Sequence, residues 1–189
     1  MNVIEAIYTR QSLGNVKPDA IPRADIERLL GAGAQAPNHY KVRPWRFVVI
    51  AGEARRQLGE GLAQALLRKS PQVGQDGLEK ERAKPFRAPL IIAVGVDRPS
   101  EPRVQEIENV CAAAAACQNI LLAATELGIS GYWRTGDAVH DPEVKAFLGL
   151  TPEQKLIGFL YLGYPATSAE PRQRPGFEDR TTWLEQRLP

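Results

Sequence analysis

Two short segments of the sequence combine an arginine with a hydroxyl side chain. Arg10-Gln11-Ser12 follows an N-terminal stretch with helical spacing, and Trp133-Arg134-Thr135 follows a short apolar run. The planar fork of an arginine and a nearby hydroxyl suit an oxyanion such as phosphate, and the second segment also suits a planar ring. Spacing alone equally allows two surface arginines, a serine bonded to local backbone and a core tryptophan, so both interpretations stay open.

A third candidate is the stretch QAPNHYKVRPWRFVVI, residues 35–50, which joins a helix-like segment to a strand-like one. Pro37 should end the helix, because the residue before a proline is disfavoured in the helical region. His39, Lys41 and Arg43 then follow, and each can carry a positive charge. The stretch is either a plain connection or a loop that holds a ligand.

Other chemistries have less support in the sequence. The segment GAGAQA, residues 31–36, matches a dinucleotide-binding pattern, but a helix precedes it and a proline loop follows, where that pattern needs a strand and then a helix. His39 and His140 lie far apart and have no partners at metal-ligand spacing, so no metal site is predicted. Neither a nucleophile elbow nor a general base is identifiable, and no catalytic side chain is assigned.

Composition narrows the class of protein. The chain has 189 residues and a net charge of +2, which gives no reason to expect nucleic-acid binding. Cys111 and Cys117 are about 240° apart on a helix, so they should not form a disulfide. The first residues lack the pattern of a signal peptide, and the longest apolar run falls short of the roughly 20 residues of a membrane span. We expect a cytoplasmic protein with no membrane partner.

The helices and strands that hold these candidate residues can be predicted from the spacing of apolar residues and from residues that start or end helices and turns. We predict a single α+β domain over residues 1–189, with residues 166–189 as an extended tail that lies across a partner or is disordered. Residues 70–87 are predicted to be a mobile excursion. Helices are expected near residues 3–10, 22–36, 53–69, 104–127 and 141–149, and strands near 45–50, 88–96, 129–133 and 154–165.

The predicted long helix, residues 104–127, carries Gln118 and Asn119 among alanines. Buried amides need hydrogen-bond partners, so an internal polar contact is one explanation. The small apolar surface also suits close approach of a flat ring or of another subunit. Gln118 is therefore a candidate cofactor contact.

Taken together, these segments resemble the FMN-dependent nitroreductase family, and most closely its small YdjA-like branch. The resemblance runs to about Pro165 and rests on RQS, AGAQAPNHYKVRPWRFVVI, APLIIAV, GYWRTG and GFLYLGYP, in that order. It implies a nitroreductase-like fold, with a central mixed or antiparallel sheet flanked by helices, in an intertwined homodimer that binds FMN at its interface.

The resemblance also implies roles for individual residues. Arg10, Gln11 and Ser12 would bind the phosphate and ribityl groups, with Trp133, Arg134 and Thr135 beside them. Gln35 and His39 would reach the flavin from the other subunit, and Pro37 and Asn38 would lie near its ring. Lys41 and Arg43 replace an asparagine and a glutamine of many members, and we predict that Lys41 stabilises reduced flavin. No FMN contact is assigned to Arg172, Arg174 or Arg180.

The implied activity is ping-pong hydride transfer from NADH or NADPH, through FMN, to a nitroaromatic or another electron-poor acceptor. One alternative is a flavin enzyme with a dedicated non-nitro substrate, such as an enone or a halogenated aromatic. Another is a flavin-binding or sensing protein with incidental reductase activity.

Overall fold

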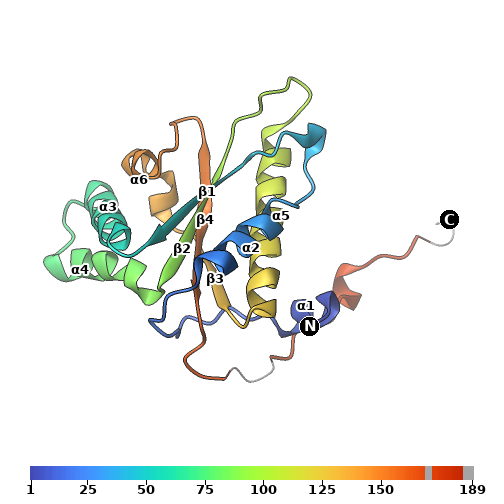
Figure 1. Ribbon diagram of the computed structural model, residues 1–189. Helices are drawn as coiled ribbons and strands as arrows, with labels where there is room; N and C mark the ends of the chain where they lie inside the picture. The colour runs from blue at the N-terminus through green and yellow to red at the C-terminus, as the bar shows by residue number, and fades with distance from the viewer. Residues whose placement is uncertain (169–171, 185–189) are drawn as a thin grey trace.

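The computed structural model describes residues 1–168 and 172–184, and its centre is a four-stranded antiparallel sheet (Figure 1). The spatial order is β1-β2-β4-β3, and each neighbouring pair is antiparallel. This arrangement agrees with the expected α+β class. The strands are β1 (Trp45–Ala51), β2 (Leu90–Val96), β3 (Ser130–Arg134) and β4 (Lys155–Gly163).

Strand β2 is buried along its whole length because helices cover both faces of the sheet. On one face lie α2 (Arg23–Gly33) and α5 (Glu106–Glu126). Their apolar residues, such as Leu29 and Ile120, join one core with Ile92. Gly33 is needed there, since a Cβ atom on it would lie 2.9 Å from the Ile120 side chain.

The other face is covered by α3 (Ala54–Lys69) and α6 (Pro142–Phe147), and α4 (Gln75–Ala83) packs against α3. The prediction of a mobile excursion over residues 70–87 is wrong, because α4 and the 3-10 turn η2 (Lys84–Arg87) occupy most of it. The sequence of α4 is mostly polar, and Leu78 is the buried residue of this helix. The α3 and α4 backbones meet at Gly59, where a Cβ would lie 2.5 Å from the Arg82 carbonyl oxygen.

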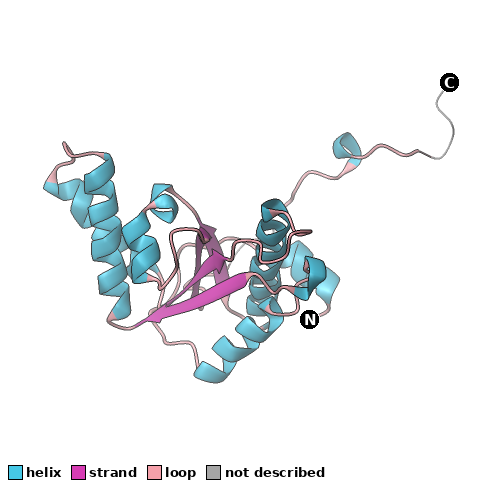
Figure 2. Ribbon diagram, turned by 90° about the horizontal axis from the view of Figure 1, so that it is seen from above, coloured by secondary structure: helices cyan, strands magenta, loops and turns pink. Residues whose placement is uncertain are grey.

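The N-terminal segment and part of the C-terminal tail lie near the end of α5. Helix α1 (Val3–Thr9) packs near the end of α5, and the Met1 amine bonds Glu126 at 3.1 Å. The short 3-10 turn η4 (Glu178–Arg180) lies in the tail, which leaves the body of the protein (Figures 1 and 2). Residues 172–184 are exposed throughout, whereas 169–171 and 185–189 lie outside the described residues.

Helix α5 is long and apolar enough to span a membrane by length and composition alone. It is instead the central helix of the core on its face of the sheet, where Ala113, Ala116 and Cys117 are fully buried. Burial raises the pKa of the Cys117 thiol to about 12. Both cysteines are free, as predicted.

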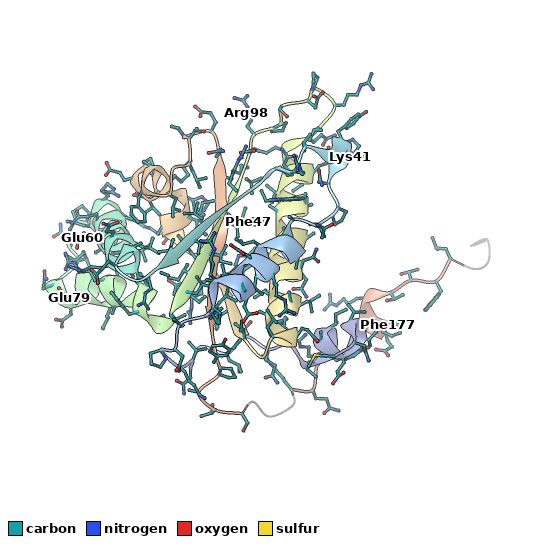
Figure 3. All side chains as sticks on the ribbon, viewed as in Figure 1. Lys41, Phe47, Glu60, Glu79, Arg98 and Phe177 are labelled. Atoms are coloured by element: carbon teal, nitrogen blue, oxygen red, sulfur yellow. The ribbon has the colours of Figure 1, made fainter. Side chains whose placement is uncertain are left out.

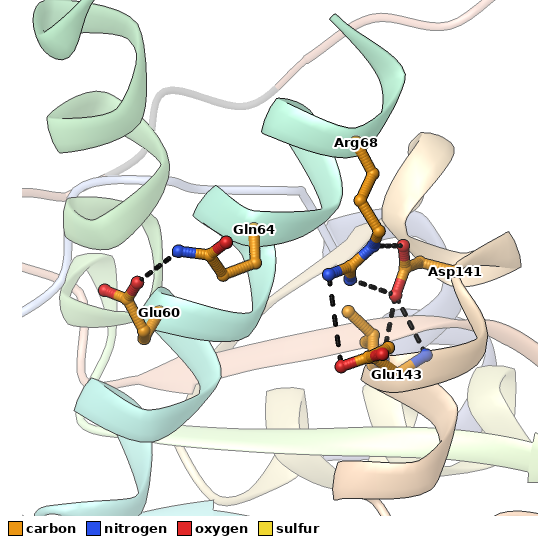
Figure 4. A network of polar contacts seen from close by, with 6 residues as sticks. Glu60, Gln64, Arg68, Asp141 and Glu143 are labelled. Atoms are coloured by element: carbon orange, nitrogen blue, oxygen red, sulfur yellow. Dashed lines mark hydrogen bonds and ion pairs between the residues drawn. The ribbon is translucent and has the colours of Figure 1, made fainter. Parts of the chain in front are cut away.

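Asp141 ties α6 to α3 (Figure 4). Its carboxylate caps α6 by accepting from the amides of Glu143 and Val144, and it accepts two hydrogen bonds from Arg68, at 3.0 and 2.7 Å. Burial opposes ionisation of Asp141, but the bonds from Arg68 and the two amides outweigh it and hold the carboxyl pKa below 3.8. The carboxylate therefore favours folding at every pH above that ordinary value.

We predict that Asp141→Ala lowers the free energy of unfolding by about 1–2 kcal/mol at neutral pH, since it removes a helix cap and a partly exposed ion pair. Asp141→Asn is the matched control, because it keeps the cap and loses only the charge. Urea unfolding should show the difference from wild type shrinking as pH falls below 3.8 through the folded pKa. A difference that grows towards acid pH would contradict this account.

Candidate functional site

Arg10 ends α1 and begins the first candidate segment. Its Nη1 lies 3.5 Å from the Ser12 hydroxyl, and its side chain is half-buried. Arg174, from the C-terminal tail, donates from Nη2 to the Arg10 carbonyl oxygen at 2.6 Å. Burial, and then the charge of Arg174, lower the pKa of Arg10. Two cationic side chains therefore share this corner beside a hydroxyl, which favours a bound oxyanion.

Sequence reasoning missed Arg174 because nothing in a tail rich in proline and charge shows where it returns. The signal that could have found it is the pair Arg172 and Arg174, placed shortly after the last strand. Only the path of the folded chain brings one of them to Arg10.

The second candidate segment lies at the end of β3, where alternation sends neighbouring side chains to opposite faces. Trp133 packs against the core that contains α5, and its Nε1 donates to the Ile157 carbonyl at 3.2 Å. The guanidinium of Arg134 lies on the other face, 3.9 Å from the centroid of the Tyr132 ring and 5.4 Å from that of Tyr161. The indole is therefore a core residue, as one of the two open interpretations held.

Arg134 is chemically unusual in this setting. In the part of the chain that the structure describes, its Nε is buried and has no hydrogen-bond partner. A buried polar group normally has one, because leaving it unsatisfied costs roughly 1–3 kcal/mol. The side chain is thus held by two tyrosine rings while a donor stays available to a ligand.

A cavity of about 780 Å³ opens beside Arg134. Its walls come from α3, η2, the end of β3, the 3-10 turn η3 (Asp137–His140) and the start of α6. Phe159 and Tyr161 line it from the sheet, and Trp133 and Thr135 border it with Arg134. Volume and lining are typical of a site for a small molecule with a flat apolar part.

The cavity also contains cationic residues that sequence reasoning did not single out. Lys84 and Arg87 from η2 line it, together with Arg68 and Lys69 at the end of α3. Lys84 and Arg87 were missed because they fall in the stretch that was predicted to be mobile. Their position follows from the turn that η2 makes before β2.

The residues that follow the first candidate segment lie close to Arg134. A second, small cavity is bordered by Leu13 and Gly14 and shares Tyr132, Arg134 and Tyr161 with the large one. A Cβ atom on Gly14 would lie only 3.4 Å from Nη2 of Arg134. The structure therefore brings Gly14, two residues after Ser12, close to Arg134 at the end of β3.

The loop after α2 lies elsewhere. Gln35, Pro37, His39 and Lys41 are exposed, and they do not contribute to the described lining of the large cavity. Figure 3 shows Lys41 beside the N-terminal end of α5, across the sheet from Glu60 of α3. The loop and the large cavity therefore lie on opposite sides of the sheet.

The conformation of the loop is unusual. Tyr40, Lys41 and Arg43 have φ values of 50°, 56° and 48°, a region that non-glycine residues rarely adopt. The side chain of Asn38 holds this loop conformation through two hydrogen bonds. Its Oδ1 accepts from the Arg43 amide at 2.8 Å, and its Nδ2 donates to the Ala36 carbonyl at 3.3 Å. The amide of Asn38 thus shapes the loop, which includes the 3-10 turn η1 (His39–Lys41).

The two amides of α5 differ in their surroundings. Asn119 is half-buried and donates to the Ala32 carbonyl at 3.2 Å, which is the internal contact expected of a buried amide. Gln118 is exposed, so burial is the wrong explanation for it. Across residues 1–168 and 172–184, no group of three histidine, cysteine, aspartate or glutamate side chains gathers as metal ligands would.

Comparison with known proteins supplies the family. Residues 7–164 match the profile of the nitroreductase family. The chain is 33% identical to YdjA of Escherichia coli (strain K12) over 171 residues, covering 89% of this chain and 91% of YdjA. It is 27% identical to YfhC of Bacillus subtilis (strain 168) over 179 residues, covering 94% and 92% of the two chains.

Two solved structures have the same fold. A nitroreductase-like family protein from Bacillus cereus superposes with a TM-score of 0.83 at 25% identity, covering 98% of this chain and 97% of that one. A nitroreductase with bound FMN from Bacteroides fragilis gives 0.75 at 26% identity, covering 98% and 100%. These matches confirm both the resemblance and the fold that it implied: the chain belongs to the nitroreductase family.

Proposed function

We propose that the protein is an FMN-dependent NAD(P)H oxidoreductase that reduces a nitroaromatic or another electron-poor acceptor. The observation that carries the proposal is the cavity beside the Nε of Arg134, which has no partner among the described residues, in a nitroreductase-family chain, and the pair of arginines at Arg10 supports it. YdjA and YfhC are both named as candidate NAD(P)H nitroreductases, and the Bacteroides fragilis relative binds FMN. The proposed location is the cytoplasm.

The corner at Arg10 fits the phosphate of FMN. Arg10 and Arg174 bring two positive charges together, and a dianion would relieve their repulsion, which contributes to the lowered pKa of Arg10. Ser12 adds a hydroxyl donor, and Gln11 lies between them. Arginine binds phosphate oxygens through two parallel hydrogen bonds, so this set provides both charge and direction.

The cavity fits the ring of the cofactor. Its volume lies within the usual range for cofactor sites, and apolar side chains such as Phe159 provide a surface for a flat molecule. Trp133, Arg134 and Thr135 form the border nearest to the first segment. The free Nε of Arg134 could donate to an oxygen or nitrogen atom of the ring or of the ribityl chain.

The remaining predicted contacts require a homodimer, which is part of the proposal. Gln35, Pro37, His39 and Lys41 are exposed on the α5 side of the sheet, so they would reach a flavin held by another subunit. Gln118 is exposed on α5 and would face the same interface. Apolar side chains that are more than half exposed support an unfilled contact surface: Val3 63%, Ile4 60%, Tyr8 77% and Ile107 61%.

The whole chain, residues 1–189, would then act as one FMN-binding domain with its tail directed to the partner. Trp183 and Leu184 of the tail are 71% and 76% exposed, as expected of a segment that packs against another subunit. Asn38 would act indirectly, by holding the loop that carries His39 and Lys41.

The chemistry that FMN supplies when bound is two-electron transfer: a nitro group, NAD(P)H and a proton give a nitroso group, NAD(P)⁺ and water. The residues of this chain bind and orient the reactants. Hydride transfer needs no general base, which agrees with the absence of an assigned catalytic side chain. A dedicated non-nitro substrate or a sensing role would use the same cofactor site, and turnover with different acceptors separates these alternatives.

The proposal predicts ping-pong kinetics, because one open cavity would serve the nicotinamide and the acceptor in turn. Initial rates measured against NADPH, at several fixed concentrations of a nitroaromatic, should give parallel double-reciprocal lines. The same measurement with NADH shows which nicotinamide is preferred. Intersecting lines with both donors would show that the two substrates bind together, contrary to the proposal.

Replacing Arg134 by alanine should weaken FMN binding by about tenfold or more, the effect of losing a hydrogen bond from a charged group. The measurement is fluorescence titration of the apoprotein with FMN. Arg23→Ala is the matched control, since the Arg23 side chain on α2 is 85% exposed and lies away from the cavity. Arg134→Ala protein that purifies with full FMN occupancy and unchanged affinity would remove Arg134 from the site.

Lys41→Ala should make the reduction potential of bound FMN more negative, because a cation close to the ring stabilises the reduced anion. A shift of about 30 mV would correspond to about 1.4 kcal/mol for this two-electron couple. Anaerobic titration against a reference dye measures the potential, and Lys80→Ala, on α4 and exposed, is the control. An unchanged potential would exclude this role for Lys41.

A further inference from the structure

The charges that line the large cavity do not cancel. Five of its lining side chains are cationic and three are carboxylates, apart from His140. Each carboxylate pairs with a cation of the same lining: Glu81 with Lys84, Asp137 with Lys69, and Asp141 with Arg68. Among the described residues, Arg87 and Arg134 therefore remain without a carboxylate partner.

The two unpaired arginines lie on the same side of the cavity. Both border the small adjoining cavity together with Tyr132 and Tyr161. Arg134 is half-buried against these rings, whereas Arg87 is exposed at the end of η2. Burial raises the pKa of Tyr161 to about 12, although the charges of Arg134 and Arg87 oppose that rise, so the tyrosine stays neutral. It does not offset the two positive charges.

The proposed function uses one of these charges and leaves the other. FMN has a single phosphate, which the corner at Arg10 and Arg174 would bind, and Arg134 is directed to the flavin. Arg87 is then the cation available to a second molecule that enters the cavity. Its exposed guanidinium can form two parallel hydrogen bonds with a carboxylate, which neutral acceptors cannot match.

We propose that Arg87 is a specificity-determining residue that binds the carboxylate of a planar, electron-poor acceptor, so that nitroaromatic acids are preferred over neutral nitroaromatics. This inference rests on the proposed function. The carboxylate takes no part in the chemistry: with 4-nitrobenzoate, two electrons from NAD(P)H and two protons, one of them from solvent, convert the nitro group to nitroso and release water.

The test compares 4-nitrobenzoate with 4-nitrobenzamide, which has similar size and an electron-poor ring but no charge. For wild-type protein, kcat/KM for the acid should exceed that for the amide by about tenfold, the effect of one charged hydrogen-bonded contact. The ratio should fall towards one in Arg87→Gln and take an intermediate value in Arg87→Lys, which keeps the charge but loses the fork. Added salt should reduce the preference, since Arg87 is exposed.

Arg23→Gln is the matched control, because it removes the same charge from an exposed position on α2. Its acid-to-amide ratio should equal that of wild type. An equal fall in this control would mean that net charge, and not a contact at Arg87, sets the preference, and would overturn the inference.

Other outcomes would also overturn it in recognisable ways. If Arg87→Gln weakens binding of NADPH in the reductive half-reaction and leaves the ratio unchanged, Arg87 binds the donor. If Arg87→Gln loses FMN, Arg87 is part of the flavin site. If wild type reduces both acceptors equally well, only this inference fails; if it binds no FMN or is not reduced by NAD(P)H, the proposed function fails with it.

Discussion

The site depends on Arg134, a cation that has no carboxylate partner among the described residues. Arg134 lies against Tyr132 and Tyr161, and its Nε is buried without a hydrogen-bond partner in the described part of the chain. Leaving this one buried donor unsatisfied is costly unless a ligand accepts a hydrogen bond from it. The sheet accounts for its position, because β3 and β4 place the arginine and the two tyrosines on one face. The same alternation puts Trp133 on the other face, where it anchors the strand in the core.

The two faces of the sheet differ in what they present: one borders the cavity, and the other carries the exposed loop. The face covered by α3, α4 and α6 opens into the cavity, and η2 and η3 bring paired charges to its walls. The face covered by α2 and α5 leads to the exposed loop with His39 and Lys41. The left-handed residues of that loop represent local strain, which often occurs at ligand contacts and is held here by Asn38. A homodimer would join the two faces, since the loop of one subunit would meet the cavity of the other.

Much of this could be predicted from the sequence, for identifiable physical reasons. The continuous apolar run of β2, the cap at Asp141 and the glycine at the end of α5 specify local structure through near neighbours. The segments at Arg10 and Arg134 were identified as candidates because an arginine beside a hydroxyl suits an oxyanion, although spacing alone also allowed two surface arginines. The approach of Gly14 to Arg134 could not be derived from spacing, because the register of the sheet and the path of residues 13–16 determine it.

The omissions have a common cause. Helix α4 has one buried anchor in an otherwise polar stretch, so periodicity did not reveal it, and Lys84 and Arg87 were missed with it. Arg174 was missed because a tail has no periodicity that shows where it packs. Gln118 was expected to be buried because its neighbours are alanines, but the helix turns it to the surface. Each case concerns a contact between segments far apart in the chain.

The central claim is that this arrangement holds FMN in a form that NAD(P)H can reduce. The direct measurement is anaerobic rapid mixing of FMN-loaded protein with NADH and with NADPH, followed by the visible absorbance of the flavin. The account predicts that at least one nicotinamide bleaches the bound flavin faster than it bleaches free FMN, and that a nitroaromatic then restores the colour. A protein that takes up no FMN, or a bound flavin that stays oxidised with both nicotinamides, would contradict it.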